Sequence, residues 1–267
     1  MKARRVAAIA LRLFYLYRGS PARIFPLLIW VAVDVLLWGF ITRYLNVVAN
    51  AKFDFVPALL GAVLFWDFLT RVMQGVTMAM FEDVWSRNFL NLFATPLTVV
   101  EYLTGLVVTA ICTSFVSLAV MLVLAQAAFG LSVLSYGVAL GPFFLVLFVS
   151  GIALGVAAAA LLLRFGPAAE WLIWPIPTVI SPFVGVFYPV SSMPLFMQVI
   201  AAVLPPSYVF EGMRAVVAGE PTPWGLLALA SALSFAYLLL ACWAFAHVFA
   251  HVIRNGLIAR YSAETIG

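Results

Sequence analysis

Charged side chains are scarce in this sequence. Asp, Glu, Lys and Arg make up only 9% of its 267 residues, whereas 66% of the residues are hydrophobic. A water-soluble globular domain needs more polar surface than this composition supplies. The scarcity of charge therefore excludes a soluble protein and predicts an integral membrane protein.

Lysine and cysteine are almost absent. Lys2 and Lys52 are the only lysines, and no Gly-rich Gly-Lys-Ser/Thr loop occurs, so the chain cannot hold ATP in a P-loop. GxSxG and HExxH motifs are missing as well, and we expect the chain not to be an enzyme by itself. Cys112 and Cys242 both lie inside apolar runs, which excludes a disulfide framework.

Histidine is equally rare. His247 and His251 are four residues apart on a predicted helix, a spacing that offers two metal ligands. No third His or Cys follows nearby, so the sequence does not predict a metal site. We expect no cofactor in this chain.

Long apolar runs make up most of the chain. A run of about 20 residues crosses the ~30 Å hydrocarbon layer of a bilayer as a helix. Six such runs predict an all-α membrane protein with six transmembrane helices, in a domain that covers residues 24–267. The runs are Ile24–Thr42, Val56–Phe81, Tyr102–Phe129, Val138–Leu163, Trp171–Val190 and Trp224–Val252.

The basic residues are unevenly distributed over the ends of these runs. With the N-terminus inside, ten of the fourteen Lys and Arg fall on inner flanks, three fall outside, and Arg71 falls within a span. Basic flanks favour the cytoplasmic side, so we expect a multi-pass protein of the cell (inner) membrane with both termini in the cytoplasm. Arg12 and Arg18 interrupt the first apolar stretch and argue against a cleavable signal. The net charge of +4 thus belongs to membrane edges and predicts no nucleic-acid partner.

The segment between the fifth and sixth runs is apolar but rich in proline. Leu195–Leu204 and Tyr208–Ala218 have about half the length that a span needs, and Pro205 and Pro206 separate them. We expect two short helices that enter the outer leaflet and return, an external re-entrant hairpin over residues 191–219. An interfacial outer hairpin without a role in transport is the alternative.

The stretch Phe81–Leu103 is predicted to lie in the cytoplasm. Its large apolar side chains recur at helical spacing on one face, which predicts an amphipathic helix that ends at Pro96. Thr98 and Glu101 have the spacing of a capping box, so the third span should begin there. The amphipathic pattern of residues 82–97 suits a helix that a cytoplasmic partner binds. The alternative is a helix that lies on the bilayer surface.

Residues 1–23 predict a second amphipathic helix. An apolar stripe that includes Val6, Ile9 and Leu13 lies opposite basic side chains such as Arg5 and Arg12. This pattern is typical of a helix in the headgroup layer of a membrane. We expect it to anchor the chain, with binding of a partner's edge as the alternative.

Charges inside the predicted spans are few. Asp34 and Arg71 both fall about ten residues, roughly 15 Å, from the inner ends of their spans, so they can pair. Asp67 precedes Arg71 by four residues on one helix and can share it. Either the three form a structural ion-pair group, because a lone buried charge is costly, or they line a substrate or proton pathway.

Two further patterns concern contacts between helices. Glu211 and Arg214 are three residues apart in the second short outer helix, where they can form a local ion pair or a gate that meets substrate. Gly151 and Gly155 allow another helix to approach the fourth span closely. Whether that helix belongs to the same chain or to a second copy is open at this stage.

Taken in order, these segments resemble the type-2 family of ATP-binding cassette (ABC) exporter permeases. The resemblance covers nearly the whole chain and is carried by two motifs, FEDVWSRNFLNLFATPLTVVEYLTG between the second and third spans and VFYPVSSMPLFMQVIAAVLPPSYVFEGMR before the last span. It implies that the first motif is a coupling helix that docks on an ATP-binding subunit. The implied contact residues are Glu82, Asp83, Trp85, Arg87, Asn88, Phe89, Leu92 and Pro96.

The second motif is implied to cap the exit of a central pathway between two permease copies. The gate candidates are Phe187, Tyr188, Pro189, Glu211 and Arg214. The resemblance further implies a homodimer in a lipid bilayer and a separate cytoplasmic subunit that binds ATP and Mg²⁺. The implied cargo is an amphipathic or hydrophobic substrate, such as a drug-like molecule, a lipid or a lipid-linked glycan.

Two other classes of function remain open. An ion-coupled secondary transporter would use Asp34, Asp67 and Arg71, although no internal repeat accompanies the six runs. A membrane scaffold without transport activity is the third possibility. Copurification of a cytoplasmic ATPase would separate the ABC permease from both.

Overall fold

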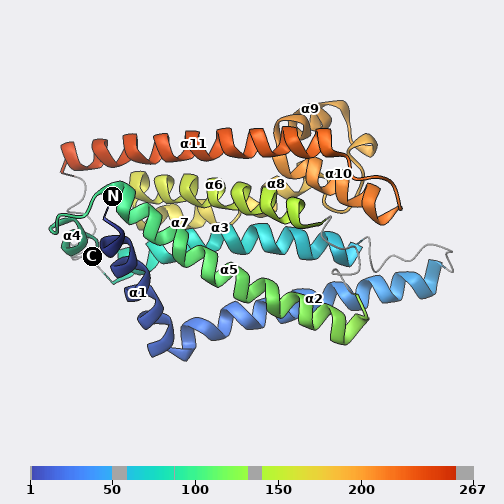
Figure 1. Ribbon diagram of the computed structural model, residues 1–267, viewed down its shortest axis with the longest axis horizontal. Helices are drawn as coiled ribbons and strands as arrows, with labels where there is room; N and C mark the ends of the chain where they lie inside the picture. The colour runs from blue at the N-terminus through green and yellow to red at the C-terminus, as the bar shows by residue number, and fades with distance from the viewer. Residues whose placement is uncertain (1, 50–58, 87, 132–139, 257–267) are drawn as a thin grey trace.

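The fold is a bundle of long helices that run side by side along one axis. The computed structural model describes residues 2–49, 59–86, 88–131 and 140–256, and every regular element within them is helical. Figure 1 shows the long helices along the horizontal axis, with α1, α4, α9 and α10 at the two ends and α7 and α8 between the long helices. The long helices are α2 (Pro21–Ala49), α3 (Gly61–Trp85), α5 (Val99–Phe129), α6 (Gly141–Phe165) and α11 (Trp224–Arg254).

Short helices occupy both ends of the bundle. Helix α1 lies across the end where α5 begins and α11 stops, and α4 sits at the same end; α9 and α10 lie at the opposite end (Figure 1). The shorter elements are α1 (Ala3–Gly19), α4 (Phe89–Phe93), η3 (Pro167–Ala169), α7 (Glu170–Ile173), α8 (Ile176–Val184), η4 (Val190–Ser192), α9 (Leu195–Val203) and α10 (Pro205–Val217).

Counted as one span, the bent α9–α10 pair is a candidate membrane crossing among the described residues. Four single helices in this part of the chain are long and apolar enough to cross a membrane, namely Leu28–Val48 within α2, and α5, α6 and α11. They correspond to four of the six runs that the sequence predicts. Helix α6 is the central one, because 67% of its most apolar window is buried against 22% to 33% in the other three. The count of six spans stays a prediction.

Helix α3 covers most of the second predicted run as one unbroken helix of 25 residues. It is not among the four, and it carries Asp67 and Arg71 in the middle and Glu82 and Asp83 near its end. At 1.5 Å per residue its length is still comparable to the thickness of the hydrocarbon layer. The predicted start of this run, before residue 59, lies outside the described residues.

The fifth predicted run differs from a single straight helix. It is divided between α7, which begins just before the run, and α8, with a break at Trp174 and Pro175. Proline has no amide hydrogen to continue the helical ladder, and Pro175 and Pro177 follow directly on α7. Pro182 lies inside α8, where the Ser181 hydroxyl donates to the Thr178 carbonyl at 2.9 Å.

The two short outer helices predicted on either side of Pro205 are present. Helices α9 and α10 follow one another after a break at Leu204 and are bent by 100°. Pro205 and Pro206 open α10, where their missing amide hydrogens cost nothing. The division into two short helices is therefore as predicted, while the re-entrant hairpin and its entry into the outer leaflet stay predictions.

Two glycines of α6 allow a close contact with α3. A Cβ at Gly151 would come within 2.7 Å of Val72 Cβ and 2.9 Å of the Leu69 carbonyl oxygen, and a Cβ at Gly155 would be equally close to Val76. Helix α6 thus touches the backbone of α3 along this face. The small-residue pattern of α6 is used within the chain.

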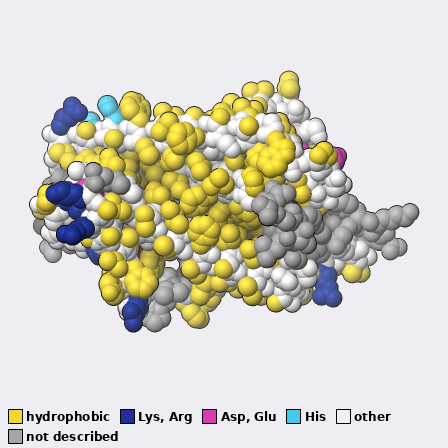
Figure 2. Space-filling model, in the orientation of Figure 1, with side chains coloured by type: hydrophobic (Ala, Val, Ile, Leu, Met, Phe, Trp, Pro, Cys, Tyr) yellow, Lys and Arg dark blue, Asp and Glu magenta, His cyan; other side chains and the backbone are white. Residues whose placement is uncertain are grey.

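The surface is apolar over the length of the bundle. Figure 2 shows hydrophobic side chains across the middle of the molecule, while Lys and Arg gather mainly at the end that holds α1 and the end of α11. A broad apolar belt is expected of a protein surrounded by lipid. The basic end matches the end predicted to be cytoplasmic.

Candidate functional site

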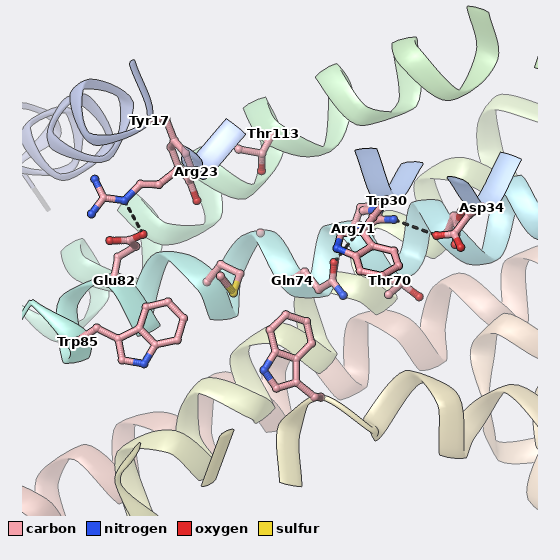
Figure 3. A pocket seen from close by; sticks show the side chains of 14 residues that line it. Tyr17, Arg23, Trp30, Asp34, Thr70, Arg71, Gln74, Glu82, Trp85 and Thr113 are labelled. Carbon is pink, nitrogen blue, oxygen red and sulfur yellow. Dashed lines mark hydrogen bonds and ion pairs between the residues drawn. The ribbon is translucent and has the colours of Figure 1, made fainter. Parts of the chain in front are cut away.

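A groove runs beside α3 on the side that faces α2. Its volume is about 490 Å³, and it extends from the middle of α3 to the end of that helix near α1 (Figure 3). Side chains from α1, α2, α3, α5 and the break after α7 line it. They are Tyr17, Arg23, Trp30, Asp34, Asp67, Thr70, Arg71, Gln74, Gly75, Met78, Glu82, Trp85, Thr113 and Trp174.

All three predicted intramembrane charges belong to this groove. Arg71 Nη2 lies 3.2 Å from Asp34 Oδ2, and Arg71 Nη1 donates to Gln74 Oε1 at 3.2 Å (Figure 3). The Arg71 side chain is only 10% exposed, against 33% for that of Asp34. The predicted pairing of α2 with α3 is therefore present.

Asp67 is not part of that pair. Its Oδ2 atom is buried and has no hydrogen-bond partner among the described residues, and the same holds for Thr70 Oγ1 and Arg71 Nε. Three of the seven buried side-chain atoms without a partner in the described part of the chain thus fall on one turn of α3. Such unpaired polar atoms in a cavity mark a place where a polar ligand or water gains hydrogen bonds.

The groove ends at the basic end of the molecule. Arg23 Nε lies 2.9 Å from Glu82 Oε1 there, and Trp85 stacks on Phe81 with ring centroids 5.2 Å apart. Burial, reinforced by the negative charge of Glu82, raises the pKa of Tyr17 at this end. A charged pair and two aromatic side chains therefore form the mouth of the groove.

Helix α1 is tied to this end of the bundle by ion pairs. Arg5 Nη1 lies 3.2 Å from Glu101 Oε2, and Arg12 pairs with Asp83, whose other oxygen accepts from the Tyr102 hydroxyl at 2.9 Å. Asp83 lies beyond the predicted inner end of its span and is fully buried. Burial raises the pKa of Asp83, with the adjacent Arg12 acting in the opposite direction.

The predicted start of α5 is confirmed. The Thr98 hydroxyl accepts from the Glu101 backbone amide at 3.3 Å, and Glu101 Oε2 accepts from the Thr98 amide at 3.1 Å, which completes the capping box. Glu101 also accepts from the Lys2 amide at 2.7 Å. The cap of α5 is thus also an attachment point for α1.

The predicted cytoplasmic helix is divided in two. Helix α3 continues through Trp85, and α4 begins only at Phe89, because Phe89 and Phe93 turn inward to pack on Tyr102. Phe93 also contacts Phe249 of α11, with centroids 4.7 Å apart. The helical spacing predicted that Trp85, Phe89 and Phe93 lie on one face of a single helix. Instead, Trp85 lies on α3 and the two phenylalanines lie on α4.

The predicted ATPase-contact residues differ in their exposure. Asp83 and Phe89 are buried, Asn88 and Leu92 are half-buried, and Glu82 is paired with Arg23. Arg87 lies outside the described residues. The exposed surface at this corner consists of Trp85, Ser86, Asn91, Ala94, Thr95 and Pro96.

The other predicted pair lies at the end of the bundle opposite α1. Arg214 Nη2 lies 2.8 Å from Glu211 Oε1, which also accepts from the Val190 amide at 2.7 Å. Arg214 Nη1 donates to the Gly185 carbonyl at 2.8 Å. Gly185 adopts φ +67°, and a Cβ there would meet the Tyr188 carbonyl at 2.9 Å. The pair on α10 thus fixes the turn that follows α8.

The remaining gate candidates lie on this turn. The Phe187 ring stacks on Trp38 of α2 at 4.8 Å, and the Tyr188 hydroxyl donates to the Pro182 carbonyl at 2.9 Å. Pro189 N-caps the short helix η4. The turn therefore connects α2, α8 and α10 at the outer end.

No group of three or more His, Cys, Asp or Glu suited to a metal ion occurs in the described part of the chain. His247 stacks on Trp243, and His251 Nε2 lies 3.1 Å from Asn255 Nδ2. Both histidines thus make local contacts on α11.

Sequence reasoning did not single out the aromatic lining of the groove. Trp30 and Trp174 are 59% and 45% exposed, and they belong to different predicted spans. Their spacing along the chain carries no signal that they meet. The interruption at Pro175 beside Trp174 was the nearest sequence clue.

Comparison with known proteins adds one finding to this geometry. The model of a family described as ABC-2 family transporter protein matches residues 40–249, which include the last third of α2, all of α3 to α10 and most of α11. The search of curated proteins gave no match.

Proposed function

The chain belongs to the ABC-2 family of transporter proteins, and on that premise we propose that it is the membrane-spanning permease subunit of an ATP-driven exporter. A separate cytoplasmic subunit binds ATP and Mg²⁺ and supplies the energy. The observation that carries the proposal is the groove, which joins a polar centre between α2 and α3 to the basic end of the bundle.

In this proposal the groove is one wall of the transport pathway. It is open along one side and mixes aromatic with charged side chains, which suits an amphipathic or hydrophobic substrate. A second copy of the chain closes the open side, so that two grooves enclose a central path. The glycine face of α6 is already occupied by α3, which supports dimer contact through another face.

The topology of the proposal follows the charge distribution. The basic end with α1 and α4 faces the cytoplasm of the cell membrane, and both termini lie there. Helix α3 and the broken α7–α8 segment complete six crossings, and the bent α9–α10 pair forms a cap on the outer side. The Glu211–Arg214 pair and the Phe187–Pro189 turn shape the outer gate.

Coupling to the ATP-binding subunit uses the exposed corner around α4. Asn91, Thr95 and Pro96 are exposed there, while Phe89 and Phe93 hold the corner against α5 and α11. When the corner moves, the motion reaches α3 through the backbone at Trp85. It reaches α1 through the ion pair between Asp83 and Arg12. This arrangement supports a transfer of motion from ATP binding to the groove.

The test is copurification followed by ATP hydrolysis. The tagged chain is purified from its native host in mild detergent, copurifying proteins are identified, and the complex is reconstituted in nanodiscs. We expect an ATP-binding cassette subunit to copurify. The double variant Asn91→Trp/Thr95→Trp places two bulky side chains on the exposed corner, and hydrolysis by its complex should fall about tenfold or more.

The matched control is Glu220→Trp, an exposed position beyond α10. Its complex should hydrolyse ATP at the rate of the unaltered protein. The buried Phe89 is left unchanged, because its replacement would disturb packing as well as contact. The permease function is wrong if no ATPase copurifies, and the proposed coupling surface is wrong if both variants hydrolyse ATP equally.

A further inference from the structure

The charges that line the groove do not balance. Arg71 is paired with Asp34, and Arg23 is paired with Glu82, so each cation already has its acid. Asp67 is the remaining acid in the lining, and no ion pair to it occurs among the described residues. When all of these groups are ionised, the groove carries one net negative charge at the level of Asp67.

The polar atoms beside this charge are also unsatisfied. Asp67 Oδ2 and Thr70 Oγ1 are buried without partners, and both accept hydrogen bonds. A buried carboxylate without a counter-ion is costly in an apolar surrounding, so binding a positive group there recovers free energy. Arg71 Nε, the third unpaired atom, is a donor and suits an oxygen on the same ligand.

Aromatic side chains surround the same space. Trp30, Trp85 and Trp174 are 59%, 47% and 45% exposed although they line the groove, so large indole surfaces remain free for contact. Trp30 lies beside Arg71 and Asp34 in Figure 3, and Trp85 lies near the mouth. Indole rings attract organic cations through their negative faces and offer apolar contact to an apolar body.

We propose that the groove selects amphiphilic organic cations, with the positive group beside Asp67 and the apolar body against Trp30 and Trp174. This assignment rests on the proposed function and names the substrate class of the same site. An anionic amphiphile would meet the unpaired acid while both arginines are already paired. A neutral one would leave Asp67 without a counter-ion.

The experiment compares two probes of similar size and shape but opposite charge, tetraphenylphosphonium and tetraphenylborate. The full-length chain is placed in nanodiscs of neutral lipid, and saturable binding of each radiolabelled probe is measured by equilibrium dialysis. Binding to empty nanodiscs is subtracted. We expect the cation to bind saturably and the anion to show no saturable binding.

Substitutions then locate the binding site. Asp67→Asn should weaken binding of the cation about tenfold or more, whereas Asp67→Glu should keep most of it. Trp174→Leu, at a half-exposed position, should weaken binding severalfold without removing a charge. Glu220→Gln removes an exposed acid beyond α10 and should leave binding unchanged.

Several outcomes would overturn the inference. They are equal saturable binding of the two probes, no saturable binding of the cation, or a cation affinity that Asp67→Asn and Trp174→Leu both leave unchanged. If Asp67→Asn fails to give folded protein in size-exclusion chromatography, the tests with Asp67→Glu and Trp174→Leu decide. The binding experiment does not require the ATPase. If an ATPase copurifies but the cation does not bind, the permease function is supported and only the proposed substrate class is wrong.

Discussion

Arg71 on α3 and Asp34 on α2 form an ion pair across the groove, with 3.2 Å between Nη2 and Oδ2. Helices α2 and α3 make few other contacts, since α2 packs mainly on α5. The pair is thus a polar connection between two helices that otherwise stand apart. Both side chains of the pair line the groove. Asp67 is the acid of the lining that has no ion-pair partner among the described residues.

The first prediction concerns this pair. Arg71→Met removes the partner of Asp34 and should destabilise the protein, while adding Asp34→Asn should restore part of the loss because Asp34 is then no longer an unpaired charge. We expect a coupling free energy of about 1 kcal/mol, since one partner is a third exposed. Reversible denaturation in mixed micelles measures it. A double variant no more stable than Arg71→Met alone would refute the pairing.

The second prediction concerns the contact between α3 and α6. Gly155→Ala places a methyl group 2.8 Å from Val76 Cβ and 2.9 Å from the Met73 carbonyl, so the helices must separate. We expect a loss of about 1–3 kcal/mol, the usual cost of overpacking. Gly141→Ala is the control on the same helix, because nothing lies within 4 Å of its added Cβ. Equal unfolding midpoints for the two variants would contradict the close approach.

The third prediction concerns the attachment of α1. Arg12→Met leaves Asp83 fully buried without its cation and should cost about 3 kcal/mol. Arg4→Met removes an exposed arginine from the same helix and should change stability little. Thermal unfolding followed by size-exclusion chromatography compares the two. Similar midpoints would show that α1 is not held through Asp83.

The fourth prediction concerns the turn after α8. Glu211→Ala removes the acceptor of the Val190 amide and the partner of Arg214, so the turn loses hydrogen bonds that connect it to α10. Hydrogen exchange of residues 185–192 should become faster, while exchange near Thr98 at the other end should not change. Unaltered exchange of the turn would show that the ion pair does not hold it.

The fifth prediction concerns topology. In a chain with Cys112→Ser and Cys242→Ser, Val199→Cys and Thr95→Cys lie at opposite ends, and both positions are exposed. A membrane-impermeant maleimide added to intact cells should label position 199 and not position 95. Labelling of position 199 only from the cytoplasmic side would overturn the outer hairpin.

The sequence predicted those features that depend on local chemistry. The capping box of Thr98 and Glu101 needs only two residues at a fixed spacing, and the bend between α9 and α10 needs only paired prolines. The Asp34–Arg71 pair could be predicted because both charges fall at similar depth in adjacent apolar runs. Each of these signals lies within one helix or follows from the cost of a buried charge.

Other features depend on tertiary packing and were not predicted. Phe89 and Phe93 turn away from the axis of α3 because Tyr102 and Phe249 offer them a buried site, and no periodicity in the local sequence reports that site. The presence of Trp30, Trp85 and Trp174 in the lining of one groove is set by how three distant segments pack. The division of α7 from α8 shows that prolines within an apolar run outweigh its hydropathy.

The glycine contact between α3 and α6 has a mechanical consequence. Where backbone touches backbone, no side chain can change rotamer to absorb a displacement, so the two helices tilt as one rigid body. Changes in the width of the groove then come from its other walls. Helix α2, which contacts α3 at few places and packs mainly on α5, and the α7–α8 segment, which is interrupted at its prolines, are the walls that can move relative to that body.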